Sequence, residues 1–206
     1  MDPLIRLSVE NLAVERGGRE LFRALSLLCE AGEAVALTGP NGAGKTSLLR
    51  AIAGFVRPST GAIRFKGAAG PIAADEARRA QCHLIGHLDG LSDSRTARAE
   101  LIFAAGWTGA NPAAALAGAG RLGLGRVLDL DVRRLSAGQR RRLALARLMA
   151  APRALWLLDE PLSPVDTAGR ALLGEVMADH LARGGLIIAA VHDPLPIPAR
   201  TLAIGG

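Results

Sequence analysis

Apolar residues along this chain fall into short runs of strand length that alternate with segments of helical character. Ile5, Leu7 and Val9 alternate with polar residues, which predicts a strand that continues through 11–18 as strand and turn. Further short apolar runs predict strands at 35–37, 62–65, 83–85, 154–158 and 186–191, and a last edge strand at 201–204. Helical patterns predict helices at 46–53, 96–105, 112–119, 136–150 and 168–182. Because strands alternate with helices, we expect an α/β fold whose mostly parallel sheet is covered on both faces.

The middle of the chain differs in texture from its flanks. Residues 92–133 are rich in Ala, Gly, Leu and Arg, which predicts a small helical lobe at about 85–135, inserted in an α/β domain. With 206 residues, we expect one domain over 1–206. No run of about 18 apolar residues predicts a membrane span, and the first residues do not resemble a signal peptide.

Composition narrows the class further. Half of the residues are hydrophobic but only 3% are aromatic, so the core must be built from aliphatic side chains. Cys29 and Cys82 fit no metal-binding spacing and no disulfide framework, which favours a reducing compartment. The net charge is +6, and only two of the 25 basic residues, Lys45 and Lys66, are lysines.

The strongest chemical signal is a Gly-rich segment between a predicted strand and a predicted helix. It reads Gly39, Pro40, Asn41, Gly42, Ala43, Gly44, Lys45 and Thr46, and matches the phosphate-binding pattern at every fixed position. Glycines let the backbone wrap phosphate oxygens, and the N–H groups of 42–46 supply positive potential. We expect Lys45 to contact the β- and γ-phosphates of a nucleotide and Thr46 to bind Mg²⁺, with Ser47 belonging to the same set. A chance Gly-rich turn is the alternative, and the agreement of motif and flanks disfavours it.

A second signal is the apolar run 154–158, which ends in Asp159 and Glu160. Carboxylates at the carboxyl end of a buried strand lie where ligands bind in such folds. We expect Asp159 to hold Mg²⁺ and Glu160 to act as the general base that activates the attacking water. An acidic turn without function is the alternative, and the phosphate-binding segment upstream makes it the weaker one.

A third signal is Leu-Ser-Ala-Gly-Gln at 135–139, at the start of a predicted helix. A helix N-terminus with small residues is a second anion site, and one triphosphate does not need two in one chain. The arrangement is explained if this segment, the signature segment (135–139), closes on a nucleotide held by a second chain. With His192 after the run 186–191 and Asp166 after Glu160, the whole set resembles the ATP-binding cassette (ABC) ATPases over nearly the full chain.

That resemblance implies a P-loop NTPase fold, with a RecA-like core, an antiparallel β lobe and an inserted helical lobe. It implies ATP and Mg²⁺ as ligands and a head-to-tail dimer that sandwiches ATP between two copies of the chain. In that dimer Ser136, Gly138 and Gln139 would contact the γ-phosphate from across the interface. His192 would sense the γ-phosphate, and Asp166 would lie in the loop that couples the two sites.

One branch of the family is more similar still. Arg-Glu-Leu-Phe at 19–22, Ile-Gly-His at 85–87 and the run 135–148 look like the ATP-binding subunits of the haem exporters of cytochrome c biogenesis. This likeness implies a peripheral ATPase on the cytoplasmic face of the inner membrane, bound to integral membrane subunits. ATP hydrolysis would power haem export or the release of a haem-loaded chaperone, with no direct contact between this chain and haem.

Two positions depart from the family pattern. Most relatives stack adenine on an aromatic side chain near the start of the chain, whereas this chain has Arg16 there, and we expect the guanidinium plane to stack on the base instead. A plain solvent-exposed charge is the alternative. Leu88 stands where the family has a Gln that touches Mg²⁺ and water. Either Asp89 reaches into the site, or the site turns over slowly without this ligand.

Other functions remain open at this point. The chain could serve another small ABC exporter or importer, could be a soluble ABC ATPase outside transport, or could bind nucleotide without turnover. Nucleic-acid binding is disfavoured: Arg140, Arg141 and Arg142 form a basic run, but there is no long Lys/Arg tract and almost no aromatic residue to stack on bases.

Overall fold

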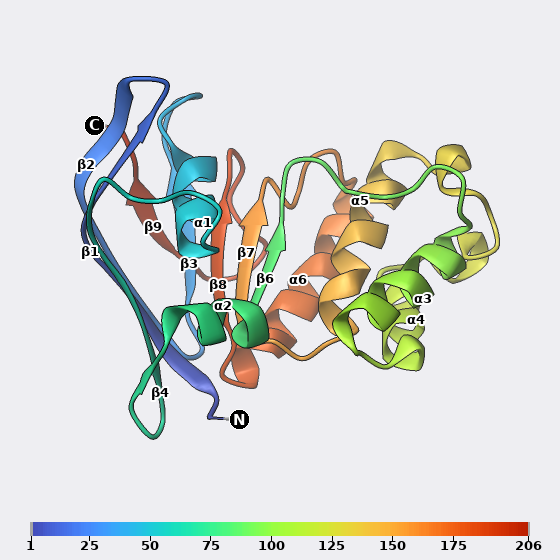
Figure 1. The fold of residues 1–206 in the computed structure, drawn as a ribbon. Coiled ribbons are helices and arrows are strands. Elements are labelled where there is room, and N and C mark those ends of the chain that lie inside the picture. The colour runs from blue at the N-terminus through green and yellow to red at the C-terminus, as the bar shows by residue number, and fades with distance from the viewer. Residues whose placement is uncertain (1, 206) are drawn as a thin grey trace.

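Two separate β-sheets and a group of helices make up the computed structural model, which describes residues 2–205 (Figure 1). The strands are β1 (Leu4–Arg16), β2 (Arg19–Glu30), β3 (Ala34–Thr38), β4 (Thr60–Gly67), β5 (Pro71–Ile72), β6 (Cys82–Ile85), β7 (Leu155–Asp159), β8 (Leu186–Ala190) and β9 (Arg200–Ala203). The helices are α1 (Lys45–Ile52), α2 (Ala74–Gln81), α3 (Ala97–Thr108), α4 (Pro112–Arg121), α5 (Ala137–Ala146) and α6 (Thr167–Ala182), with 3₁₀ turns at Gly125–Val127, Val132–Arg134 and Arg147–Met149.

The predicted parallel sheet is confirmed. It has five strands in the order β6-β7-β8-β3-β9, all parallel, so that β3 lies beside β8 although most of the chain separates them. Every residue of β7 and β8 is buried, because helices or the second sheet cover both faces. This topology brings the carboxyl ends of β3, β7 and β8 to one edge of the sheet.

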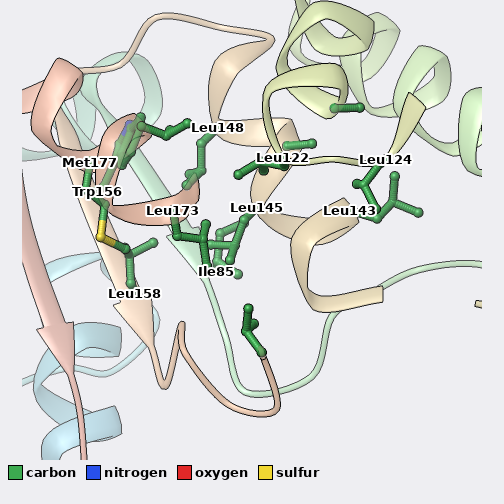
Figure 2. Packing of buried hydrophobic residues seen from close by; sticks show 14 of the residues in the cluster. Ile85, Leu122, Leu124, Leu143, Leu145, Leu148, Trp156, Leu158, Leu173 and Met177 are labelled. Carbon is green, nitrogen blue, oxygen red and sulfur yellow. The ribbon is translucent and has the colours of Figure 1, made fainter. Parts of the chain in front are cut away.

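Alternate residues of these strands face two different cores. Trp156 and Leu158 point to the side of α5 and α6, where they pack with residues of the helical lobe (Figure 2). Leu155 and Leu157 point to the opposite side, where α1 and the second sheet close the other core. As the composition predicts, both cores are mostly aliphatic; Trp156, Phe22 and Phe65 are their only buried aromatic residues among 2–205.

The second sheet is antiparallel, in the order β2-β1-β4-β5, and forms the lobe on the left of Figure 1. Residue patterns alone did not predict β2, β5 or α2. Irregular pairing of β2 with β1, with register shifts between Val9 and Leu12 and again between Leu12 and Val14, breaks the period-two pattern that marks a strand. Helix α2 is polar and buries only Ala77 and Gln81, so its apolar stripe is too narrow to detect.

The helical lobe lies between β6 and α5. Thr96 caps α3 by accepting a hydrogen bond from the N–H of Ala99, and Asn111 caps α4 ahead of Pro112. The predicted helix over 136–150 is shorter than expected, because α5 ends at Ala146 and continues as a 3₁₀ turn. Within residues 2–205, no helix is both long and apolar enough to cross a bilayer.

Candidate functional site

The phosphate loop (39–46) connects β3 to α1, as its motif requires. Gly39 and Gly44 have φ angles of 133° and 103°, which favour glycine. A Cβ on Gly39 would collide with the carbonyl oxygen of Ile204, and one on Gly44 would lie 2.8 Å from the ring of Phe22. Both positions therefore need glycine for conformation and for space, and the ring of Phe22 in β2 packs against the loop at Gly44.

Lys45 is buried at the first position of α1, with 7% of its surface exposed. Its Nζ donates to the carbonyl oxygens of Gly39 at 2.6 Å and Pro40 at 3.1 Å. Among residues 2–205 no carboxylate forms an ion pair with it. The ammonium charge is therefore uncompensated by the protein and available to an anionic phosphate.

Thr46 and Asp159 meet beside this ammonium group. The Thr46 hydroxyl lies 3.0 Å from each carboxylate oxygen of Asp159, which is 3% exposed at the end of β7. Two oxygen ligands side by side suit Mg²⁺, which usually takes one or two protein ligands and completes its shell with phosphate and water. No cluster of three or more His, Cys, Asp or Glu side chains in the described chain offers a metal site of the all-protein kind.

Glu160 has a left-handed backbone, with φ of 51°. Such a conformation costs a non-glycine residue on the order of 1 kcal/mol or more, and it turns the side chain away from the strand direction. The N–H of Glu160 donates to the carbonyl of Ala190 at 2.9 Å, and Arg141 donates to the Glu160 carbonyl at 3.1 Å. These bonds fix the backbone, so the carboxylate is held beside the phosphate loop.

Two histidines flank the Glu160 carboxylate. His192, after β8, places Nε2 3.0 Å from Oε1, and His87, after β6, places Nδ1 3.9 Å from Oε2. His192 was predicted for this site, whereas His87 was not. The rule that ligands bind at the carboxyl ends of parallel strands would have pointed to His87, because it follows β6 in the same way.

These side chains line one cleft of about 810 Å³. Arg16, the residue expected to stack on adenine, is part of its wall. Sequence reasoning missed four lining residues, namely Arg19, Leu21, Arg50 and His87. The complete lining is Arg16, Arg19, Leu21, Asn41, Gly42, Ala43, Gly44, Lys45, Thr46, Ser47, Arg50, His87, Asp159, Glu160 and His192.

The signature segment and Asp166 lie outside this cleft. Ser136 and Gln139 form a capping box at the start of α5, with hydrogen bonds of 3.2 and 2.9 Å. Asp166 caps α6 by accepting from the N–H of Gly169 at 2.8 Å. A Cβ on Gly138 would lie 3.3 Å from the carbonyl of Pro164, so the two helix starts adjoin. One chain therefore keeps these residues together on a second surface, apart from the cleft.

Asp89 is not part of the cleft lining, which argues against the alternative in which it replaces the missing Gln. Asp89 forms an ion pair of 2.9 Å with Arg141, a residue only 2% exposed, and this bond turns Asp89 toward α5. Leu88 is 85% exposed and projects into solvent. The arginines of the basic run on α5 are also engaged within the protein: Arg140 pairs with Asp93, and Arg142 donates to the carbonyl of Leu122.

Comparison with known protein families matches residues 22–163 to the model described as "ABC transporter". Among curated proteins, the chain is similar to the "Cytochrome c biogenesis ATP-binding export protein CcmA" of several bacteria. Identity is 46% over 201 residues with the protein from Rhodopseudomonas palustris strain HaA2, and the match covers 98% of each chain. With the Bradyrhizobium diazoefficiens protein it is 46% over 202 residues, covering 98% of this chain and 99% of that one.

Solved structures show the same fold. A putative ABC transporter ATP-binding protein from Pyrococcus furiosus superposes with a TM-score of 0.78 at 19% identity, covering 97% of both chains. A structure titled as the ATP-binding subunit of an ABC transporter gives a TM-score of 0.76 at 26% identity, covering 90% of this chain and 79% of that one. The combination of a parallel sheet, an antiparallel lobe and a helical lobe is therefore shared with proteins of that description.

Proposed function

Because this chain belongs to the ABC transporter family of ATP-binding proteins, we propose that it is the ATP-hydrolysing subunit of the exporter for cytochrome c biogenesis. One observation supports hydrolysis above all: Lys45, Thr46, Asp159 and Glu160 face a single cleft. The assignment to cytochrome c biogenesis is supported by 46% identity, over nearly the whole length, to proteins named for that process.

Each residue then has a role in cleaving ATP. The phosphate loop and Lys45 hold the β- and γ-phosphates, and Thr46 and Asp159 hold Mg²⁺. The metal ion, when bound, neutralises charge that develops on the phosphate oxygens. Glu160 accepts a proton from the water that attacks the γ-phosphorus. The bond from that phosphorus to its bridging oxygen breaks, and ADP and inorganic phosphate leave. His192, 3.0 Å from Glu160, keeps the carboxylate oriented and lies within reach of the γ-phosphate.

A second copy of the chain completes the site in this proposal. Ser136 and Gly138 are not part of the cleft lining and lie on a separate surface at the start of α5. A head-to-tail pairing would bring the signature segment of each copy over the cleft of the other. Asp166, beside that segment, would then connect the two sites. The domain of 1–206, with its helical lobe at about 85–135, would act as one unit.

Integral membrane subunits are the proposed partners, which places the chain at the cytoplasmic face of the inner membrane. A groove of about 1240 Å³ between α2 and the helical lobe fits this role. Its wall includes Phe55 and Trp107, which are 75% and 84% exposed, and the charged side chains of Arg78 and Arg79. Apolar rings beside arginines fit a cytoplasmic segment that is apolar and acidic. Haem would be handled by the membrane subunits, without contact to this chain.

ATP hydrolysis by the complex with its membrane subunits tests the proposal. We expect Glu160→Gln to lower kcat at least about 100-fold with little change in ATP affinity, because an amide cannot accept the proton of water. Glu175→Gln is the matched control, since Glu175 is exposed on α6 away from the cleft, and it should keep full activity. Equal loss in both variants, or none in either, would contradict the role of Glu160.

The strongest alternative is a nucleotide-binding module without turnover, which Leu88 at the Gln position favours. That alternative predicts ATP binding but no release of phosphate by the wild-type complex. A second measurement, of the membrane partners and of haem export, distinguishes the proposed function from that of an ATPase in a different transporter. Under the proposal, the membrane subunits that co-purify are those of the cytochrome c biogenesis exporter, and cytochrome c maturation in cells, which reports haem export, depends on Glu160.

A further inference from the structure

Two histidines line the cleft, and His87 is the one to which the proposed function gives no role. It contributes a ring to the wall of the cleft and points its Nδ1 at the second carboxylate oxygen of Glu160, at 3.9 Å. The first oxygen is already occupied by His192 at 3.0 Å. The proposed general base therefore lies between two imidazole rings that come from different strand ends.

The backbone on both sides of His87 is bonded to α5 and to the 3₁₀ turn that follows it. Arg141 donates to the carbonyl of Gly86 at 2.8 Å and to the Asp89 carboxylate at 2.9 Å. Arg147 donates to the carbonyls of Asp89 and, at 3.2 Å, of Gly90. Because the loop at 86–90 is hydrogen-bonded on both sides of His87 and Leu88, these bonds determine where the two side chains point. Leu88 projects into solvent and His87 faces the cleft.

We propose that His87 is a positioning residue for ATP hydrolysis, one that replaces the absent Gln by orienting Glu160 through a hydrogen bond to its second oxygen. This inference rests on the proposed function, because it assigns a role within the same reaction. In a neutral imidazole with its proton on Nδ1, the ring donates to Oε2 while His192 donates to Oε1. Each oxygen of the carboxylate keeps a free lone pair for the attacking water.

The separation of 3.9 Å is longer than a hydrogen bond, so the ring must move to make it. The side chain of His87 is 69% exposed, so a rotation toward Glu160 meets little resistance. A movement of α5 would also bring His87 toward Glu160, because Arg141 and Arg147 bond the loop at 86–90 to the helix and its end. The N-terminus of α5 holds the signature segment, so docking of a second copy would close the contact. Glu160 alone takes the proton of the attacking water.

Steady-state ATP hydrolysis by the full complex tests this role. We expect His87→Ala to lower kcat about tenfold or more, as the loss of a hydrogen bond to a charged group would, and to leave KM for ATP within about twofold. His87→Asn should recover most of the lost rate, because its amide nitrogen occupies the place of Nδ1. Leu88→Ala is the matched control in the same loop and should behave as wild type.

A double variant separates positioning from a structural effect. In the Glu160→Gln background, His87→Ala should cause no further loss, because the group that it orients no longer accepts a proton. Wild-type kcat in His87→Ala would overturn the inference, as would a raised KM with unchanged kcat, or failure of His87→Asn to recover activity. Absence of hydrolysis by the wild-type complex would instead overturn the proposed function.

Discussion

At the scale of the residue, Arg16 is the side chain that we propose stacks on the base of the nucleotide. Arg16 lines the cleft beside Arg19, in a lobe that offers no aromatic ring at this position. A guanidinium plane stacks on an aromatic base and stays charged at any physiological pH. The chain therefore has the chemistry for base stacking without the aromatic residue that most relatives use.

We expect Arg16→Ala to raise KM for ATP several-fold and to leave kcat nearly unchanged, because stacking of one base contributes on the order of 1 kcal/mol or more. Arg16→Trp should keep or lower KM. Steady-state kinetics over a range of ATP concentrations measures both. Arg23→Ala serves as the control, since Arg23 pairs with Glu20 outside the cleft. Unchanged ATP affinity in Arg16→Ala would mean that Arg16 is only a solvent-exposed charge.

Leu88 offers a gain of function. A glutamine there would add an amide that can orient water or contact Mg²⁺, neither of which leucine can do. We expect Leu88→Gln to raise kcat of the assembled complex by a few-fold. Because Leu88 is 85% exposed, the change should leave stability within about 0.5 kcal/mol. A lower or unchanged kcat, together with unaltered thermal stability, would count against the alignment of Leu88 with the family Gln.

The sequence could predict a residue wherever its role depends on a local motif. Lys45, Thr46, Asp159, Glu160 and His192 follow from spacing and from strand ends, and all five line the cleft. The direction of a loop side chain depends on partners that are distant along the chain. The ion pair of Asp89 with a buried arginine on α5 could not be inferred from the run Gly-His-Leu-Asp-Gly at 86–90, because that arginine lies 52 residues further along the chain.

At the scale of the element, α5 connects more parts of the site than any other helix. Arg141 extends from it to the loop before the helical lobe, through Gly86 and Asp89, and to the carbonyls of Asp159 and Glu160. The residue is 2% exposed, and its charge is compensated by one carboxylate and several carbonyl oxygens. A buried guanidinium of this kind connects α5 with the backbone of Asp159 and Glu160.

We expect Arg141→Met to lower the free energy of unfolding by about 3 kcal/mol, because it leaves the Asp89 carboxylate and several carbonyls without their donor. Urea unfolding of the purified chain measures this. Arg140→Met, on the same helix, should cost less than about 1 kcal/mol, since the Asp93 partner of Arg140 is 64% exposed. Equal effects of the two changes would mean that the buried network contributes little.

The start of α5 has a structural role as a helix cap and a proposed role in phosphate contact, and two substitutions of Ser136 separate them. Ser136→Ala should lower stability by about 1 kcal/mol through loss of the cap. Ser136→Asp keeps a good N-cap and should retain the stability, yet it places a negative charge where the γ-phosphate of the partner copy would lie. We expect it to reduce hydrolysis more strongly than Ser136→Ala does, as phosphate release would show. The reverse order would argue against a contact with phosphate.

Helices and strands with a clear hydrophobic periodicity could be predicted from the sequence, and irregular elements could not. The strands β7 and β8 are continuous apolar runs, and α6 begins and ends near its expected limits. The strand β2 escapes detection because its pairing with β1 is interrupted by irregular register, and Ala24 in its middle has a positive φ of 52°. Tertiary pairing, rather than local preference, holds such a strand extended.

At the scale of the whole molecule, two partly buried histidines make stability depend on pH. Burial lowers the pKa of His83 and of His180 to about 4, and each ring nitrogen Nε2 contacts a backbone carbonyl, at 3.0 Å from Ala151 and 3.1 Å from Ala154. The ring of His180 also stacks on Trp156 at 3.7 Å. Both rings are therefore neutral in the folded protein at neutral pH.

Unfolding exposes these rings, and their pKa returns to about 6.5. The full stability is present above pH 6.5 and is lost as pH falls toward 4, because only the unfolded chain then takes up protons. We expect each histidine to contribute a slope of up to about 1.4 kcal/mol per pH unit in that window. Thermal unfolding between pH 7 and 5.5 measures the slope, which the double variant His83→Gln/His180→Gln should flatten. An unchanged slope would assign the dependence to other groups.

Separation of the signature segment from the cleft has a kinetic consequence. In the proposed head-to-tail pairing, the phosphate lies on one surface of each copy and the completing residues come from the other copy, so that one chain alone does not complete a site. Under the proposed pairing, the rate per molecule in dilute solution must rise with concentration, since each turnover begins with an encounter of two copies. Attachment of both copies to one membrane assembly replaces that encounter with a local concentration on the order of millimolar. The membrane subunits would then act as a scaffold that frees the reaction from dilution.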